Sequence, residues 1–307
     1  GMLGEYRGYE VMGLPGPTSG PTVMEILNIL STFDLVGTNH GDPAVLHLII
    51  ESIRLAAADR FTWMGDPEKT GAPIGALTVP VYGAERAKSI DRTKAGPADA
   101  GDPWPFEGRE MPADFPGPAG AAADDGTTHI SVVDKDRNAV ALTQTNLYLS
   151  GVVNPGVGVM MNNGIGWSCP IPGTVNTIAP HARALNNMTP LILLKDGELR
   201  GALGASGGRR IWTSVAQSLI HHIDMGMSLQ DAVQAPRIHV EDGDVMVDGR
   251  FEHDTINGLR SRGHQVTIVD PRYDVAPYAE PNGIAVDGGE LRSAVYPVAK
   301  LTVAAGY

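Results

Sequence analysis

The sequence has a single cysteine, few basic residues and no apolar run long enough to cross a bilayer. Cys169 alone allows neither an intrachain disulfide nor a cysteine metal cluster. The 23 basic residues are outnumbered by 35 acidic ones, and the formal net charge of −12 disfavours nucleic acid and anionic membranes as partners. No basic segment followed by an apolar one opens the chain, so we expect a cytoplasmic protein.

The composition is that of a chain that can bury a full hydrophobic core. Of its 307 residues, 42% are hydrophobic and 19% are charged, which is enough for one large domain. Apolar residues at helical spacing predict one helix after a capping box of Thr22 and Glu25, and another from Ala44 to about Trp63. Six prolines and six glycines among the 31 residues 96–126 then predict an extended connection along the surface.

From Thr127 onward the pattern changes to that of β-structure. Alternating residues around short turns predict two hairpins, 129–134 with 139–145 and 190–194 with 199–205. Further strands are predicted at 157–161 and 265–269, and helices are predicted after Gly208, after Ser228 and near 252–262. Strands in hairpins with helices between them favour an α+β fold of layered sheets over a doubly wound parallel sheet.

The abrupt change at Gly126-Thr127 has the arrangement that self-cleavage requires. The Thr127 hydroxyl would attack the Gly126 carbonyl, the acyl group would shift from nitrogen to oxygen, and water would hydrolyse the ester. The amine freed on Thr127 has a near-neutral pKa and suits the role of base for its own hydroxyl. The alternative is a linker that meets an ordinary strand, and on these residues alone the alternative is favoured.

Short motifs spread along nearly the whole chain reverse that preference. They are Tyr6–Val11, Ala58–Arg60, Gly65–Pro67, Thr127–Asp136, Met161–Asn163, Gly207-Gly208 and the terminal Gly306-Tyr307. In this combination the sequence resembles the γ-glutamyltranspeptidase family of N-terminal-nucleophile (Ntn) hydrolases. The resemblance implies a four-layer αββα sandwich without the family's usual N-terminal region. Residues 1–126 would correspond to the end of the large subunit and 127–307 to the small subunit, together forming one domain.

The same resemblance implies the catalytic groups. Thr127 would be the nucleophile and the first residue after self-cleavage, and Thr145 would support its hydroxyl. The backbone N–H groups of Gly207 and Gly208, at a strand-to-helix turn, would form the oxyanion hole. No metal or organic cofactor is implied. The expected reaction is hydrolysis of a small amide, or transfer of its acyl group, through an acyl-enzyme.

Positions that bind the substrate in typical family members are changed. An asparagine expected two residues after Thr145 is replaced by Leu147, with Asn146 beside it. The acidic pair that contacts the substrate's α-amino group is replaced by Gly166-Trp167, and Trp167 could wall the pocket there. The serine pair that holds the α-carboxylate is replaced by Asn186-Asn187, whose amides still donate hydrogen bonds. We therefore expect a smaller or differently charged amide as substrate, with a γ-glutamyl compound as the alternative.

Two other classes of function stay open. One is a non-catalytic relative that depends on a partner, because the missing N-terminal region would leave an apolar face for a homodimer or another polypeptide to cover. The other is dinucleotide binding at Gly201–Gly207, although the glycine spacing differs from G-x-G-x-x-G. His129 shares a strand face with Thr127 and either lines the site or fills the core. His221 and His222 point to different faces of a helix, which favours a surface pair over metal ligands.

Overall fold

The helices form one side of the molecule. The computed structural model describes residues 1–119, 127–147, 150–274, 277–298 and 302–306. Its α-helices are α1 (Gly20–Leu30), α2 (Pro43–Trp63), α3 (Pro67–Thr70), α4 (Ile74–Leu77), α5 (Pro80–Ala87), α6 (Ile211–Ile223), α7 (Leu229–Gln234) and α8 (His253–Ser261). Three short 3-10 turns are η1 (Trp104–Glu107), η2 (Gly164–Trp167) and η3 (Gly208–Arg210). None of these helices combines the length and apolar character that a bilayer crossing requires.

The main sheet is antiparallel and has six strands in the order β1-β2-β5-β6-β10-β11. Their bounds are β1 Met2–Tyr6, β2 Tyr9–Met12, β5 Leu191–Lys195, β6 Glu198–Ser206, β10 Glu280–Asp287 and β11 Glu290–Val295. A small separate sheet of three strands contains β7 Ile238–His239, β8 Val245–Asp248 and β9 Val266–Val269. The chain is therefore α+β, as the sequence predicts.

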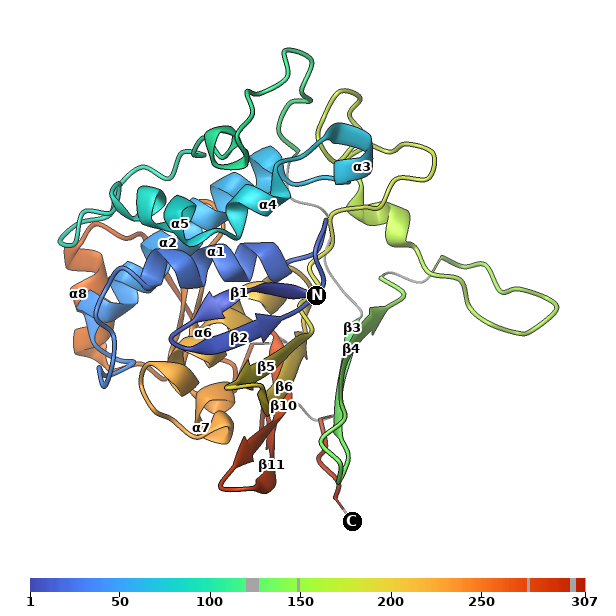
Figure 1. Ribbon diagram of the computed structural model, residues 1–307. Helices are drawn as coiled ribbons and strands as arrows, with labels where there is room; N and C mark the ends of the chain where they lie inside the picture. The colour runs from blue at the N-terminus through green and yellow to red at the C-terminus, as the bar shows by residue number, and fades with distance from the viewer. Residues whose placement is uncertain (120–126, 148–149, 275–276, 299–301, 307) are drawn as a thin grey trace.

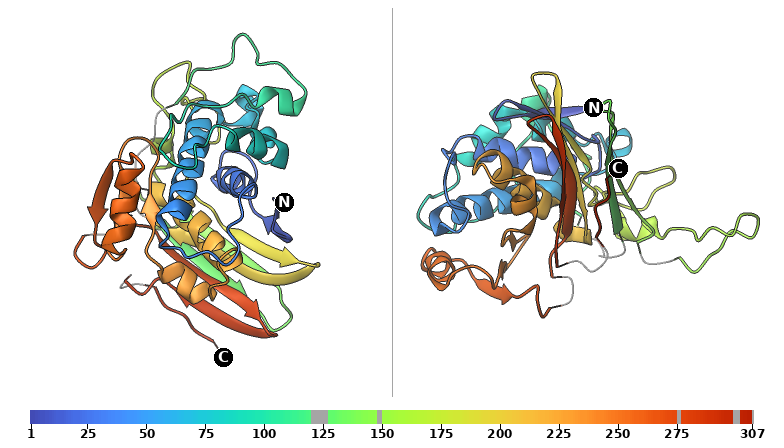
Figure 2. Two further views of the ribbon diagram at one scale, coloured as in Figure 1. Left: turned by 90° about the vertical axis from the view of Figure 1, so that its left-hand side faces the viewer. Right: turned by 90° about the horizontal axis from the view of Figure 1, so that it is seen from below.

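Helices cover one face of the main sheet, as Figures 1 and 2 show. Every residue of α1 is buried because the helix lies between the sheet and the outer helices. The helix is mainly apolar, as suits such a central position, although the polar residues Thr22, Glu25 and Asn28 are buried in it as well. The N-cap of α1 is Ser19, so Thr22 lies inside the helix and the predicted capping box is wrong.

A two-stranded hairpin lies against the other face of the main sheet. It consists of β3 (Thr127–Val133) and β4 (Ala139–Thr145). In the turn of this hairpin, Arg137 donates a hydrogen bond to the Gly289 carbonyl in the β10–β11 turn. The β10–β11 turn lies near the N-terminal end of β6, because β10 runs antiparallel to β6: Glu280 pairs with Ser206 and Ala285 pairs with Gly201. The open end of the hairpin, where β3 begins and β4 ends, therefore lies near the C-terminal end of β6 (Figure 1).

The outer face of the hairpin is apolar and exposed. Because side chains alternate along a strand, four of them point away from the main sheet: Ile130, Val132, Val140 and Leu142, each between 44% and 54% exposed. In the αββα arrangement a helix layer would cover this face, and no helix of the described residues does so. The described chain thus supplies one helix layer, the main sheet and the β3–β4 part of the second sheet.

Two local predictions are wrong. Residues 157–161 form no strand; a single bridge between Val153 and Met160 is all that pairs there. His221 is 1% exposed, so it is a core residue and not half of a surface pair. The Gly201–Gly207 run begins in β6 of the predicted hairpin with β5, and the absence of a βαβ unit at this strand pair disfavours the dinucleotide-binding alternative.

Candidate active site

Two threonines face each other at the open end of the β3–β4 hairpin. Thr127 is the first residue of β3, and its Cα pairs with that of Thr145, the last residue of β4. Both residues are half-buried and lie on the inward face, whereas Thr128 and Gln144 next to them are exposed. The Thr145 hydroxyl oxygen accepts a 2.8 Å hydrogen bond from the Leu147 backbone N–H, which fixes its rotamer. Gly126, the other half of the predicted cleavage site, lies outside the described residues.

His129 lies on the same inward face and fills the space between the hairpin and the main sheet. Its Nδ1 is 2.7 Å from the Thr143 hydroxyl and its Nε2 is 3.0 Å from the Ser131 hydroxyl. A Cβ at Gly204 of β6 would overlap the imidazole ring, so a glycine is required there. His129 is thus a packed core residue behind Thr127, which settles the alternative that the sequence leaves open.

Burial lowers the pKa of His129 to about 4 from the ordinary value near 6.5. The folded state therefore favours the neutral ring, and the unfolded chain binds more protons between these two values. The contribution of His129 to the free energy of unfolding is therefore fully present above about pH 6.5 and is lost as the pH falls through 4. The total loss from this residue is on the order of 3 kcal/mol.

We expect His129→Gln to show a weaker loss of stability between pH 7.5 and 4.5 than the unmodified chain, measured by urea unfolding at both values. His253 is an exposed histidine at the start of α8, so His253→Gln serves as the matched control. Equal pH dependence in the His129 variant and the control would contradict this assignment.

Gly207 and Gly208 form the turn between β6 and α6. Gly207 has φ +126° and Gly208 has φ +57°. A Cβ on Gly207 would lie 2.5 Å from the Ala279 Cα, so the backbone passes too close for any side chain. Since β6 runs toward the open end of the hairpin, this turn lies at the same end of the stacked sheets as Thr127 and Thr145.

The two asparagines predicted to bind substrate have different surroundings. Both ends of the Asn186 amide are hydrogen-bonded to backbone groups: its Nδ2 donates to the Pro17 carbonyl at 3.0 Å and its Oδ1 accepts from the Met188 N–H at 3.1 Å. The Asn187 Oδ1 instead accepts from the Arg60 guanidinium at 3.1 Å. Sequence reasoning missed Arg60, whose only signal is its place in the Ala58–Arg60 motif.

The other two predicted substrate positions lie in the segment that follows Thr145 and in the 3-10 turn packed against it. Asn146 is exposed and, by strand alternation, faces away from the side on which Thr145 lies; its backbone carbonyl accepts from the Asn163 N–H at 3.0 Å. Trp167 is half-buried in η2, where its carbonyl accepts from the Asn176 amide at 2.7 Å. Leu147 is buried beside Gly166, so the segment after β4 packs against η2.

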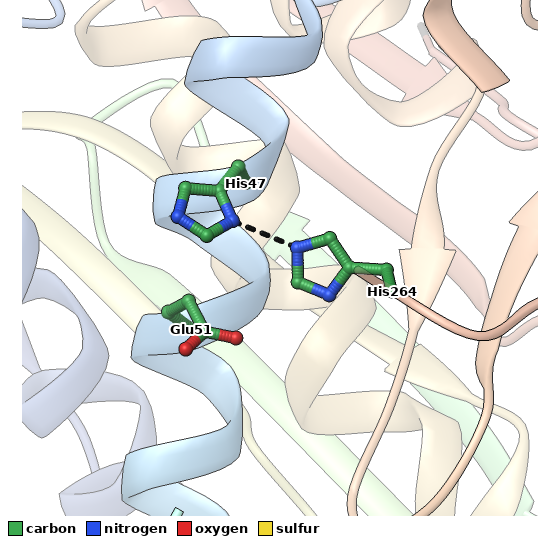
Figure 3. A group of neighbouring side chains, drawn as sticks. All are labelled: His47, Glu51 and His264. Carbon is green, nitrogen blue, oxygen red and sulfur yellow. Dashed lines mark hydrogen bonds between the residues drawn. The ribbon is translucent and has the colours of Figure 1, made fainter. Parts of the chain in front are cut away.

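One group of side chains in the described part of the chain has the residue types of a metal site: His47 and Glu51 on α2 with His264 (Figure 3). The His47 Nδ1 and the His264 Nε2 are 2.8 Å apart, which is a direct hydrogen bond, and the His47 Nε2 contacts the Asp91 carbonyl at 2.7 Å. The Glu51 oxygens accept from Arg54 and from the Gly96 N–H. These contacts satisfy the group and tie α2 to the segments around residues 91–96 and 264.

Comparison with known proteins agrees with this geometry. The family model described as gamma-glutamyltranspeptidase matches residues 2–304. The glutathione hydrolase proenzyme of Escherichia coli is 33% identical over 285 residues, covering 87% of this chain and 46% of that protein. The acylase ACY 1 proenzyme of Pseudomonas sp. strain SE83 is 35% identical over 274 residues, covering 88% and 46%. The chain thus spans about half the length of these curated relatives.

Solved structures share the fold. The cephalosporin acylase from Bacillus halodurans superposes with a TM-score of 0.81 at 26% identity, covering 96% of this chain and 50% of that one. A highly active W525D mutant of gamma-glutamyltranspeptidase from Pseudomonas nitroreducens has a TM-score of 0.51 at 29% identity, covering 59% of this chain and 99% of that one. With a family model matched over nearly every residue, the chain belongs to the γ-glutamyltranspeptidase family of Ntn hydrolases.

Proposed function

We propose that this chain is a self-cleaving N-terminal-threonine amidohydrolase or acyltransferase. The observation on which the proposal rests is that Thr127 begins a strand at the end of the stacked sheets where the Gly207-Gly208 turn lies. In maturation the Thr127 Oγ attacks the Gly126 carbonyl and the Gly126–Thr127 C–N bond breaks as an ester forms. Water then hydrolyses that ester, which leaves a carboxylate on Gly126 and a free amine and hydroxyl on Thr127.

The mature site would then use the same atoms on a substrate. The Thr127 amine takes the hydroxyl proton, Oγ attacks the amide carbonyl, and the N–H groups of Gly207 and Gly208 stabilise the oxyanion. The proton passes to the departing amine as the C–N bond breaks. Water or an acceptor amine resolves the ester, giving hydrolysis or transfer. Thr145, already held by its hydrogen bond, would orient the nucleophile.

Two subunit-like segments, 1–126 and 127–307, would result from this cleavage. The solved transpeptidase chain from Pseudomonas nitroreducens is matched over 99% of its own length while covering 59% of this chain, a share close to that of residues 127–307. This correspondence supports a boundary before Thr127. Both segments would stay in one domain, because β2 from the first segment pairs with β5 from the second and β1 pairs with β2.

The substrate we propose is a small amide. Glutathione hydrolases and acylases both occur among the relatives, and the Gly166-Trp167 replacement removes the carboxylate that an α-amino group would require. Losing a buried charge-assisted contact costs about 1.5–3 kcal/mol. That cost disfavours γ-glutamyl compounds relative to amides without the amino group.

Mass spectrometry of the purified protein, followed by a panel of amide substrates, tests this function. We expect two fragments cut before Thr127 and release of amine from at least one amide. A chain that stays intact at 32.4 kDa and turns over none of the panel would refute it.

We also propose that the exposed hairpin face, formed by Ile130, Val132, Val140 and Leu142, is covered in a homodimer. Contiguous apolar surface of this kind is unusual in a monomer. Light scattering should give twice the chain mass, and Leu142→Glu, which places a charge in this face, should lower it to that of one chain.

A further inference from the structure

A cavity of about 800 Å³ lies at the end of the main sheet opposite the candidate active site. Its floor comes from β2 and from the β5–β6 and β10–β11 hairpins, and its wall is the connection from α6 to α7, residues 226–230. Figure 1 shows these elements in its lower half. Arg200 lines the cavity near the start of β6, and Gly207 follows the end of that strand. At about 3.4 Å per residue, the two positions are roughly 20 Å apart.

A β-bulge turns Arg200 toward this cavity. Leu193 of β5 pairs with Gly201 of β6. The next residue of β5 pairs with Leu199, so Arg200 is an extra residue between the two pairs. In a regular strand Arg200 would point to the face opposite that of Gly201. The bulge breaks that alternation, and Arg200 lines the cavity on the helix-covered side of the sheet.

Two cations of the cavity have no carboxylate within ion-pair distance in the part of the chain that the structure describes. The Lys195 ammonium lies 4.7 Å from the centroid of the Tyr9 ring. The Arg200 Nε is buried and has no hydrogen-bond partner among the described residues. A third cation, Arg292, is already paired with two carboxylates of its own hairpin. Two unpaired cations in one cavity favour an anionic ligand.

The chemistry of the two cations favours a phosphate group. Arg presents a fork of donors that bonds phosphate in pairs, and Lys is a compact charge that often binds phosphate in proteins. A phosphate ion alone would fill a small part of about 800 Å³, a volume in the range of sites for small organic molecules. The phosphate is therefore expected to be part of a larger ligand.

The other polar groups of the cavity limit what that larger ligand is. Asp196 and Asp287 also line the cavity, so a second anionic group would meet carboxylates. Carboxylates accept hydrogen bonds from hydroxyls. The His222 Nδ1 lies 2.8 Å from the Met227 carbonyl, which requires the proton on Nδ1 and leaves Nε2 of the neutral ring as a further acceptor. These groups suit a ligand with one phosphate and several hydroxyls.

We propose that this cavity binds the phosphate monoester of a hydroxyl-bearing small molecule, with its phosphate on Lys195 and Arg200. Such a ligand would join the β5–β6 hairpin to the connection between α6 and α7. The inference goes beyond the proposed function and does not depend on it, because none of the candidate catalytic residues lines the cavity.

Calorimetric titrations at constant ionic strength test this site with glucose 6-phosphate, glucose and inorganic phosphate. We expect glucose 6-phosphate to bind at least about 10-fold more tightly than glucose, because only the ester makes charge-assisted hydrogen bonds. Inorganic phosphate should compete with the ester but bind more weakly, because it lacks the hydroxyl contacts. Fructose 1,6-bisphosphate should bind no more tightly than glucose 6-phosphate, because its second phosphate would meet the carboxylates.

Arg200→Gln and Lys195→Gln should each weaken glucose 6-phosphate binding roughly 10-fold and change glucose binding little. Arg92→Gln is the matched control. The Arg92 guanidinium also lies over an aromatic ring, 5.2 Å from the Phe33 centroid, but it is exposed and does not line the cavity. Its variant loses the same charge and should bind as the wild type does. If Arg200→Gln failed to fold, Lys195→Gln would still test the site.

The proposal is overturned if glucose 6-phosphate binds no better than glucose or than inorganic phosphate. It is also overturned if Arg92→Gln weakens binding as much as the two cavity variants do. Chain cleavage and amide turnover are separate measurements. A protein that cleaves itself and hydrolyses amides but binds no phosphate ester would lose this site and keep the proposed function, and the reverse result would do the opposite.

Discussion

Thr127→Ala is expected to leave the chain permanently intact and to lower amide turnover by at least about 10³-fold. The substitution removes the only oxygen that can attack the preceding carbonyl from this position, and with it both the cleavage and the nucleophile. The backbone of β3 keeps its pairing with β4, because alanine preserves the N–H and C=O groups of that ladder. Intact mass after prolonged incubation and release of amine from the best substrate of the panel measure the two losses.

Thr128→Ala is the matched control for this experiment. Thr128 is the same residue type in the same strand, but it is exposed on the outer face of the hairpin. Its variant should cleave and turn over substrate as the wild type does. Thr127→Ser keeps a hydroxyl at the critical position and should still cleave. If Thr127→Ala were cut at the same bond, the proposed chemistry would be wrong.

The geometry of the threonine pair could be predicted from the sequence because it depends on local rules. A turn at residues 135–138 and a period of two fix which residues face each other across a hairpin. The observed register pairs Thr127 with Thr145. Alternation likewise places His129 on the inward side. The packing of His129 against Gly204 could not be predicted, because no local pattern shows where the hairpin lies on the main sheet.

Contacts between distant segments could not be predicted. Asn187 is held by Arg60, which lies 127 residues earlier in the chain, and no spacing rule connects them. His221 was misplaced because burial of a helix face depends on what packs against it, here including His40. Residues 157–161 have strand composition, but a strand needs a partner, and the structure provides a single bridge.

Gly207→Ala is expected to lower kcat by about 10²–10³-fold, the size of effect seen when one oxyanion donor is lost. An alanine cannot adopt φ +126° without strain, and its Cβ would lie 2.5 Å from the Ala279 Cα in the neighbouring backbone. The turn must shift, and its N–H group moves with it. The ground-state carbonyl depends less on that donor than the oxyanion does, so KM should change little.

Gly226→Ala separates this loss from ordinary backbone strain. Gly226 also has positive φ, at +69°, but no atom lies within 4 Å of a Cβ built there. Its variant should lose about 1–2 kcal/mol of stability and keep its kcat. Because self-cleavage forms an oxyanion of the same kind, the fraction of cut chain must be measured in each sample and kcat expressed per cut molecule. A Gly207→Ala protein that is folded, fully cut and as fast as wild type would mean that the glycine turn shapes the chain without stabilising the reaction.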